Sequence, residues 1–438
     1  MITRAPGGAD PAGGAPHSEG GQGAQRPFFR SRWVPAPGHV RELEPRSGLP
    51  GGFRASGVAC GMKPSGRRDL GLLVCDAPDA ASAARFTSSS AAAAPVQLTR
   101  ERCRLNALRA VLANSGCANA ATGSRGLDDA AKTQGAAGLA AGVPEAQVAL
   151  ASTGSISDEL PVAAMLKGIL EAKEALSPDG DGAFADAIQT TDAFEKRVHL
   201  EVQLPAGSAR ISAQCKGAGM ISPRFATMLC FVQTDAQLEA ETAELLLGVC
   251  VARSFDRITV DGQLSTNDTA ILMCSGASGI RVAPESEEEL RLGEALDALL
   301  RQLAILIVAD GEGAGRIARV VARGGSTQLI ERAARAVANS PLVKAALHGG
   351  DPNWGRIAQA VGGALPGEEL LALEISIEGI RVCSAGAAVP YDAAALRDAV
   401  QRDEVEFEIG LPGSGAETEV FFSDLSPGYV AVNAEYTT

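Results

Sequence analysis

Histidine is scarce in this sequence, whose 438 residues contain four: His17, His39, His199 and His348. Two of these lie in the first 48 residues, a segment rich in glycine, proline and alanine. A histidine-based zinc site and a Ser-His-Asp triad are therefore both difficult to assemble. We expect any nucleophile in this chain to use a base other than histidine.

Paired cysteines and long apolar runs are also missing. The nine cysteines include no Cys-x-x-Cys pair, and several lie in apolar runs such as Leu72-Leu-Val-Cys75. This is typical of small core residues in a reducing compartment. No apolar run approaches the roughly 18 residues that a membrane-spanning helix needs. We expect a cytoplasmic protein without a membrane partner.

Positive charge is the third deficit, because 39 lysines and arginines face 52 aspartates and glutamates, a net charge of −13. This balance argues against a nucleic-acid partner. Nucleotide signatures are weak: Lys216 precedes its glycines, unlike a Walker A lysine. In Gly311-Glu-Gly-Ala-Gly315 the third glycine comes one position early for a dinucleotide loop.

The length suggests two or three structural units. Residues 1–48 show no hydrophobic period, so we predict that they are disordered; their arginines match a transit peptide only weakly. Further on, strands come in pairs with helices grouped between them, which favours an α+β layered sandwich. The expected strands are 52–59, 69–75, 109–114, 147–151, 196–203, 209–214, 256–261, 270–274, 316–322, 370–376, 380–383, 405–410, 417–423 and 428–433. The expected helices are 127–141, 161–174, 181–189, 237–252, 287–308 and 327–338.

A loop rich in glycine and proline near the middle of the chain delivers a hydroxyl residue to a strand. Pro223 excludes a helix through this loop, and Thr227 precedes the apolar run Met228-Leu-Cys-Phe-Val232. A threonine hydroxyl is a poor nucleophile without an adjacent base. If the chain were cut before Thr227, its α-amine, with a pKa of about 7.7–8, could act as that base.

Such a cut needs a small preceding residue, which Ala226 supplies, and an oxyanion hole. Ser152-Thr-Gly-Ser155, at the end of an apolar strand, is a candidate donor loop. On spacing alone a threonine nucleophile is less favoured than an ordinary loop before a strand, because Ala-Thr pairs are common and most begin ordinary strands.

Collinear motifs from about residue 50 to the C-terminus make the threonine nucleophile the favoured interpretation. Together they resemble the ornithine acetyltransferase (glutamate N-acetyltransferase) family of arginine biosynthesis. The motifs are Asn114-Ser-Gly-Cys-Ala-Asn-Ala120, Ala151-Ser-Thr-Gly154, Thr190-Thr-Asp192, Lys216-Gly-Ala-Gly-Met-Ile221, Ala226-Thr-Met-Leu229, Arg257-Ile-Thr-Val-Asp-Gly262, Ser265-Thr-Asn-Asp-Thr269, Asp310-Gly-Glu-Gly313, Asn339-Ser-Pro-Leu-Val-Lys344, Asp351-Pro-Asn-Trp-Gly-Arg-Ile357 and Val432-Asn-Ala-Glu-Tyr-Thr-Thr438.

The resemblance implies an autocatalytic cut between Ala226 and Thr227, with Thr227 as the acyl-accepting nucleophile. It implies an oxyanion hole formed by Thr153 and Gly154. The implied substrate-binding residues are Thr190 or Thr191 (we favour Thr190), Lys216, Thr227, Glu312, Asn433 and Thr438. Each has an ordinary alternative: a loop lysine, a helix cap, or terminal residues. The family pattern differs at Arg224-Phe225, at Ser155-Ile-Ser157 and at Ala121, none of which is a reacting group.

The resemblance also implies an α/β/β/α-type sandwich, like the aminopeptidase/ornithine acetyltransferase fold, with a smaller α+β C-terminal domain. The expected divisions are a tail (1–48), an α chain (49–226), a β-chain part completing the catalytic domain (227–315), and a C-terminal domain (316–438). The last strand and tail of that domain are expected to return to the active site.

The implied activity is transfer of the acetyl group of N-acetyl-L-ornithine to L-glutamate. No cofactor is expected, and acetyl-CoA remains an open second donor. The cleaved chains are expected to assemble as α2β2, without nucleic-acid or membrane partners. Two alternatives stay open: an N-terminal-threonine amidase or aminopeptidase of similar fold, and an uncleaved, inactive binding protein.

Overall fold

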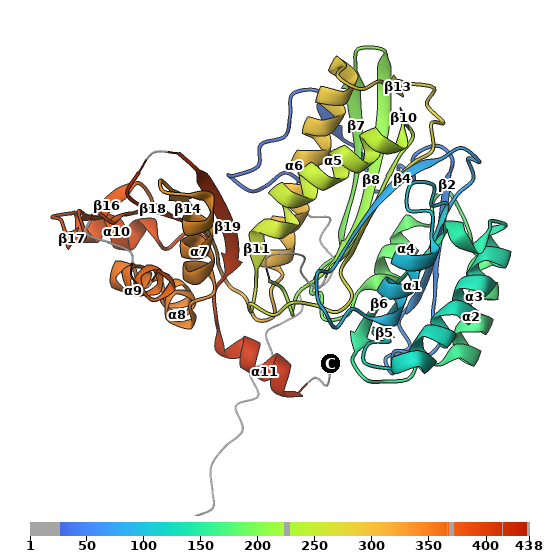
Figure 1. Ribbon diagram of the computed structural model, residues 1–438, viewed down its shortest axis with the longest axis horizontal. Coiled ribbons are helices and arrows are strands. Elements are labelled where there is room, and N and C mark those ends of the chain that lie inside the picture. The colour runs from blue at the N-terminus through green and yellow to red at the C-terminus, as the bar shows by residue number, and fades with distance from the viewer. Residues whose placement is uncertain (1–26, 223–227, 366, 368–371, 414, 436–438) are drawn as a thin grey trace, which may run out of the picture.

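The computed structural model describes residues 27–222, 228–365, 367, 372–413 and 415–435 (Figure 1). Ala226, Thr227 and Thr438 lie outside these residues. Two units are visible, a larger one with stacked sheets and a smaller one that holds most of the C-terminal third (Figure 1).

A four-stranded sheet begins the larger unit, in the order β2-β3-β5-β6. β2 and β3 form an antiparallel pair, β5 lies antiparallel to β3, and β6 lies parallel to β5. The strands are β2 (Phe53–Val58), β3 (Leu70–Cys75), β5 (Ala110–Cys117) and β6 (Val148–Ser155). All four were expected, but β5 continues to Cys117, past the expected end at residue 114, and β6 includes Ser152–Ser155, which the sequence predicted to be a loop.

The second sheet of this unit has six strands in the order β1-β7-β8-β9-β12-β4. At its centre β8 and β9 are antiparallel, and Lys216 lies opposite Leu229 at their shared end. The strands are β1 (Val40–Glu42), β4 (Ala81–Phe86), β7 (Lys196–Leu204), β8 (Gly207–Lys216), β9 (Leu229–Thr234) and β12 (Thr269–Cys274).

Side-chain packing arranges these sheets into four layers. Leu73 and Val111 of the four-stranded sheet pack with Phe231 and Met273 of the six-stranded sheet in one buried cluster. The outer face of the first sheet is covered by α1 (Ala94–Arg102), α2 (Gly123–Ala141) and α3 (Val162–Glu174). The outer face of the second is covered by α5 (Ala240–Arg253) and α6 (Glu287–Ala309).

This order confirms the expected α/β/β/α sandwich. A further helix, α4 (Asp181–Ile188), contributes Phe184 and Ile188 to the cluster between the sheets. It contacts strands of both sheets and ends just before Thr190.

The smaller unit is a seven-stranded sheet in the order β11-β19-β14-β18-β15-β16-β17, which packs its own buried cluster against helices. β11 (Ile258–Thr259) joins it from the middle of the chain and pairs with β19. The other strands are β14 (Ile317–Arg323), β15 (Glu374–Ile377), β16 (Ile380–Ser384), β17 (Ala387–Ala388), β18 (Glu404–Gly410) and β19 (Glu417–Ser423). The helices are α7 (Thr327–Ala338), α8 (Pro341–Gly349), α9 (Trp354–Ala364) and α10 (Ala393–Ala399).

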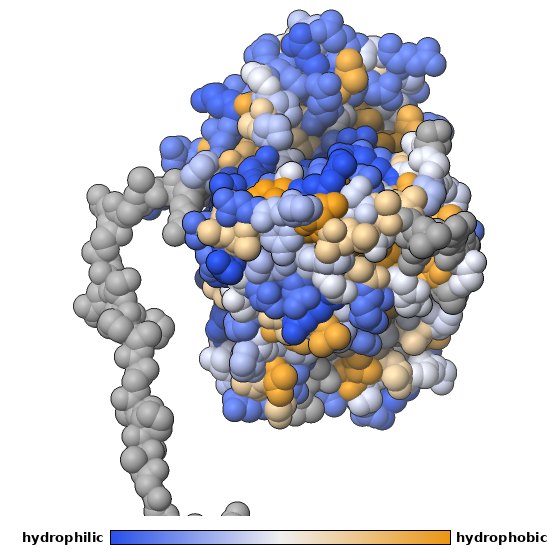
Figure 2. Space-filling view, turned by 90° about the vertical axis from the view of Figure 1, so that its left-hand side faces the viewer, coloured by the Kyte–Doolittle hydropathy of each residue, from blue (hydrophilic) through white to orange (hydrophobic). Residues whose placement is uncertain are grey.

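Viewed from the side of the smaller unit, hydrophilic side chains cover most of the surface, and hydrophobic ones lie in small separate groups (Figure 2). A minor parallel pair, β10 (Gln237–Leu238) and β13 (Arg281–Val282), lies beside α5 and α6. Within the described ranges, even the 23-residue α6 lacks the combination of length and apolar character that a membrane crossing requires.

The prediction of a disordered tail is wrong for residues 27–48. Phe28 and Val34 are buried in the larger unit, and β1 pairs with β7. Arg32 forms an ion pair with Glu378 of the smaller unit, and Trp33 Nε1 donates a 3.1 Å hydrogen bond to Glu406 Oε2. This segment therefore links both units. Its anchors are separate aromatic and charged side chains, which leave no periodic pattern in the sequence.

The predicted strand 428–433 is also wrong, because these residues belong to a helix, α11 (Pro427–Glu435). Pro427 suits a first helical position, where an amide N–H has no intrahelical partner. None of the residues of α11 is buried, so its valines do not mark a sheet face. α11 still places Asn433 beside residues of the larger unit.

We predict that Trp33→Ala lowers the free energy of unfolding by about 2 kcal/mol. A fully buried tryptophan costs roughly 3–5 kcal/mol on truncation, and Trp33 is half-buried. Its ring lies 5.5 Å from that of Phe421. Urea denaturation measures the change. Trp33→Phe, which keeps an aromatic ring and loses only the N–H, should cost less than half as much; equal losses would contradict a packing role.

Candidate active site

A cavity of about 600 Å³ opens where several strand ends of the larger unit meet the ends of α6 and α11. Its walls come from several separated parts of the chain. They are residues 62–67, the ends of β5 and β6 with the residues that follow them, the segment after α4, the end of β8 with its following loop, residues 265–267, and Glu312 with Asn433 and Glu435. Thr153, Gly154, Thr190, Thr191, Lys216, Glu312 and Asn433 all line this cavity.

Thr153 and Gly154 end β6 beside the irregular end of β5. Gly154 has φ 130°, and a Cβ there would lie 2.4 Å from the carbonyl carbon of Gly116. A side chain is therefore excluded at Gly154. The β5–β6 register shifts between Gly116 and Cys117, which turns the end of this strand pair toward the cavity.

Lys216 is the cation at the floor of the cavity, with 2 % of its surface exposed. Its Nζ donates hydrogen bonds to Thr190 Oγ1 at 2.8 Å and to Thr153 Oγ1 at 3.3 Å. Burial lowers the pKa of Lys216, while the negative charge of Asp192 opposes that effect. A partly desolvated ammonium of this kind attracts a carboxylate strongly.

A buried ion cluster lies behind this wall of the cavity. Lys196 Nζ donates to Asp192 Oδ1 at 2.8 Å and also to Asp310 Oδ2. The carboxylate of Asp192 accepts hydrogen bonds from the amides of Thr190 and Gly217, and that of Asp310 accepts one from the amide of Ala193. The cluster therefore fixes the segment after α4, the end of β8 and the end of α6 relative to one another.

Glu312 is the anion that faces Lys216 across the site. Its Oε1 accepts a 2.9 Å hydrogen bond from Thr191 Oγ1, and its Oε2 accepts a 2.7 Å bond from Asn433 Nδ2. A Cβ on Gly219 would lie 2.6 Å from this carboxylate, so a glycine is needed there. Thr190 and Thr191 both face the cavity, one bonded to Lys216 and the other to Glu312.

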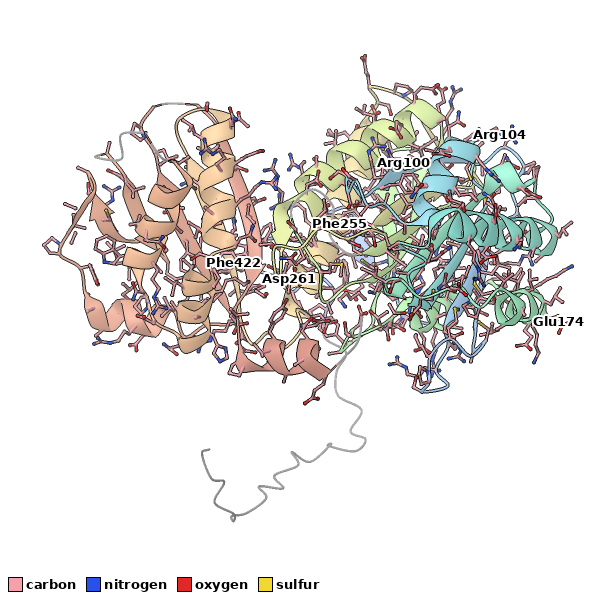
Figure 3. The ribbon with its side chains drawn as sticks, turned by 60° about the horizontal axis from the view of Figure 1, so that its bottom comes forward. Arg100, Arg104, Glu174, Phe255, Asp261 and Phe422 are labelled. Carbon is pink, nitrogen blue, oxygen red and sulfur yellow. The ribbon has the colours of Figure 1, made fainter. Side chains whose placement is uncertain are left out.

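The described residues on both sides of 223–227 are tightly held. Before this segment, the carboxylate of Asp261 accepts hydrogen bonds from the amides of Met220 and Ile221. After it, the amide of Met228 donates to Asp268 Oδ1 at 3.1 Å. Figure 3 shows Asp261 at the junction with the smaller unit, between Phe255 and Phe422.

Comparison with known proteins gives the same assignment as the motifs. A sequence model described as the ArgJ family matches residues 54–438. The arginine biosynthesis bifunctional protein ArgJ of Deinococcus radiodurans is 42% identical over 398 residues, which is 89% of this chain and 98% of that protein. The protein of the same name from Thermus thermophilus is 41% identical over 89% of this chain and 99% of its own.

The chain belongs to the ArgJ family. This confirms the resemblance seen in the sequence. A crystal structure of ornithine acetyltransferase complexed with ornithine, from Mycobacterium tuberculosis, is 36% identical with a TM-score of 0.39. The match covers 43% of this chain and 100% of that chain.

A Ser-His-Asp arrangement does occur in this ArgJ-family chain, but away from the cavity. His199 Nδ1 lies 2.6 Å from Ser212 Oγ, and its Nε2 lies 2.8 Å from Asp181 Oδ2. Ser212 has no exposed surface and stands within the six-stranded sheet. These three residues therefore stabilise the interior and cannot meet a substrate.

Sequence reasoning missed two groups that build the site of this ArgJ-family chain. Asp192 lies in the motif Thr190-Thr-Asp192, but its pairing with Lys196 was not predicted, because i, i+4 spacing indicates an ion pair only on a helix and no helix was expected there. The segment 62–67 carries only turn signals, Pro64 and Gly66, in the sequence. Its position on the cavity wall depends on the packing of Met62 against Gly116 at the end of β5, which no local pattern in the sequence records.

We predict that Asp192→Asn lowers the free energy of unfolding at pH 7 by about 3 kcal/mol, because breaking a buried pair leaves an uncompensated charge. Burial raises the pKa of Asp192, but the charges of Lys216 and Lys196 outweigh it, so the pKa is depressed. A depressed pKa gives stability that is present at neutral pH and lost as pH falls below about 4. The variant should therefore show a shallower acid dependence in urea denaturation between pH 5 and 3.

Asp76→Asn is the matched control, since Asp76 pairs with Arg54 at the surface. An exposed pair contributes about 1 kcal/mol or less. Equal losses in both variants would contradict a structural role for the buried cluster.

Proposed function

We propose that this chain is a glutamate N-acetyltransferase that moves the acetyl group of N-acetyl-L-ornithine to L-glutamate through an acetyl ester on Thr227. The observation that carries this proposal is the convergence of Thr153, Gly154, Lys216, Glu312 and Asn433 on one cavity. These residues match the motifs of the family and come from separate parts of the chain. Thr227 immediately precedes Met228, and Leu229 lies opposite Lys216.

The two charges of the site suit the two charges of N-acetylornithine. Lys216 would bind the α-carboxylate through its buried ammonium. The Thr153 and Thr190 hydroxyls hold that ammonium in place and use two of its three donors, which leaves one for the carboxylate. Glu312 would bind the δ-ammonium, and Asn433 and Thr191 orient its carboxylate. Thr438 belongs to the same proposal through the family motif.

In the first half-reaction the Thr227 α-amine takes the hydroxyl proton while Oγ attacks the acetyl carbonyl. Thr153 and Gly154 would stabilise the oxyanion. The C–N bond then breaks, the proton passes to the departing α-amine of ornithine, and the acetyl group remains on Oγ. In the second half-reaction the α-amine of glutamate attacks this ester. Collapse of the intermediate releases N-acetylglutamate and restores the hydroxyl.

Activation would require cleavage of the Ala226–Thr227 peptide by the threonine hydroxyl, through an ester that water hydrolyses. The cleaved chains are proposed to remain together and to pair as α2β2. No metal or nucleotide takes part in this route, because one acyl bond is exchanged for another of similar energy. To test acetyl-CoA as a second donor, the enzyme is supplied with acetyl-CoA and glutamate in the absence of N-acetylornithine.

The competing function is hydrolysis by an N-terminal-threonine amidase, in which water replaces glutamate. Ornithine release that is unaffected by glutamate, with acetate as product, would identify that enzyme. Release that depends on glutamate and yields N-acetylglutamate identifies the transferase. Ping-pong kinetics are expected, and strictly sequential kinetics would exclude the covalent route.

We predict that Thr227→Ala leaves the chain at its full-length mass and without transfer activity. The alanine removes both the hydroxyl that would cleave the chain and the nucleophile. Intact mass spectrometry and an N-acetylglutamate assay measure the two effects. Thr227→Ser is the matched control and should cleave slowly, because it loses only the methyl group that restricts the hydroxyl rotamer. A wild-type protein that stays uncut yet active would exclude this chemistry.

We also predict that Glu312→Gln raises the KM for N-acetylornithine about tenfold or more, because a charge-assisted hydrogen bond is replaced by a neutral one. Steady-state kinetics with a fixed glutamate concentration measure the change. N-acetylnorvaline, which has the same carbon chain without the terminal amine, is the control substrate. If the variant loses activity equally on both substrates, Glu312 does not bind the ammonium group.

A further inference from the structure

The proposed reaction places opposite demands on one cavity. N-acetylornithine carries one carboxylate and a side-chain ammonium, whereas glutamate carries two carboxylates. Glu312 suits the ammonium, but a side-chain carboxylate brought to the same wall would be repelled by it. If Lys216 binds the α-carboxylate in both half-reactions, the second carboxylate of glutamate requires a second cation.

The loop of residues 60–69 presents basic side chains on another wall of the cavity. Lys63 and Arg67 line the cavity together with Thr153, Lys216 and Glu312. This loop is held rigidly, because the fully buried Asp69 carboxylate accepts hydrogen bonds from four consecutive backbone amides. These bonds come from Cys60, Gly61, Met62 and Lys63, at 2.7, 3.0, 2.6 and 3.0 Å.

The same loop packs against β5, the strand that pairs with the Thr153-Gly154 end of β6. A Cβ on Gly116 would lie 3.2 Å from both the backbone and the side chain of Met62. Asn114 Nδ2 also approaches Met62 Sδ at 3.6 Å. Lys63 is therefore fixed to the β5–β6 end of the cavity, and its side chain is half-buried.

Among the described residues neither Lys63 nor Lys216 forms an ion pair with a carboxylate, and Lys63 is the one not already assigned to the α-carboxylate. Arg67 forms an ion pair with Asp186 at 2.9 Å and also bonds Gln189. Lys216 faces the negative charge of Asp192. Lys63 Nζ donates one 2.6 Å hydrogen bond, to the backbone carbonyl of Arg68, which leaves two of its three donors for another group.

We propose that Lys63 binds the side-chain carboxylate of the acceptor glutamate, a subsite used in the second half-reaction and idle in the first. This inference rests on the function proposed above. The electrostatics support it: burial and the nearby Arg67 and Lys216 lower the pKa of Lys63 to about 8, although Asp186 and Asp69 oppose this. A bound carboxylate would stabilise the ammonium form of Lys63 against these effects.

The ordinary alternative is that Lys63 only closes its own turn through the Arg68 carbonyl. That role predicts a loss of loop stability, with both half-reactions affected alike. A carboxylate subsite predicts a loss confined to dicarboxylate acceptors. The two half-reactions of the cleaved enzyme therefore separate the alternatives.

The experiment uses the full chain carrying Lys63→Met, Lys63→Arg, or Lys167→Met. Lys167 on α3 gives the same change in net charge at an exposed position, 80% exposed and paired with Glu171. Rapid-quench measurement of ornithine release reads the first half-reaction. Steady-state kinetics with glutamate and with glutamine as acceptors read the second.

For Lys63→Met we expect the KM for glutamate to rise about tenfold or more and the preference for glutamate over glutamine to fall by a similar factor. The ornithine burst should change less than about twofold. Lys63→Arg should recover most of the preference, and Lys167→Met should resemble the wild type. An unchanged preference in Lys63→Met, or equal losses in both half-reactions, would overturn the assignment.

Calorimetric binding of L-glutamate and L-glutamine to the wild type and to Lys63→Met tests the subsite apart from transfer. Glutamate should bind the wild type about tenfold more tightly than it binds the variant, with glutamine nearly unaffected. If ornithine is never released but this difference holds, the proposed function fails and the subsite stands. If transfer occurs and the two proteins bind glutamate equally, the subsite fails alone.

Discussion

The site of this protein depends on a buried cluster of charges. Lys196, with no exposed side-chain surface, joins Asp192 to Asp310, and these carboxylates hold the amides of Thr190, Gly217 and Ala193. Three separate parts of the chain, around Asp192, Gly217 and Asp310, are fixed by a few atoms. An ion cluster suits this task because its hydrogen bonds are directional, whereas apolar packing tolerates small displacements. The cost of burying the charges is offset only if all partners are present.

The rest of the fold brings this cluster to a common edge. Two stacked sheets place the ends of β5, β6 and β8 next to each other, and α6 ends just before Asp310 and Glu312. After the last strand of the smaller unit, α11 places Asn433 beside Glu312. Residues 27–48 tie both units together from another side. The cavity thus needs nearly the whole chain, and no single segment could form it.

Charge balance around the cavity connects the fold with the proposed chemistry. A buried ammonium on Lys216 and a carboxylate on Glu312 match a zwitterionic substrate, and the rigid Asp69-held loop adds Lys63 on a further wall. A site that exchanges one amino acid for another must keep both kinds of charge and still avoid neutralising them internally. Threonine hydroxyls and Asn433 separate them here, since they bond to each charge without cancelling it.

The sequence by itself determined most elements of the sandwich and several of the residues around the cavity, because hydrophobic periodicity and family motifs are local signals. It failed where the cause was tertiary. Residues 428–433 contain the short apolar run Tyr429-Val-Ala-Val432 yet belong to a helix, and none of them is buried, so the run does not mark a sheet face. Residues 27–48 show no period, but separate anchors such as Phe28 and Trp33 order them. Only the packed structure decided that Thr190 and Thr191 face opposite charges, that Asp192 and Lys196 organise the site, and that Lys63 reaches it, because these relations depend on distances between elements far apart in the chain.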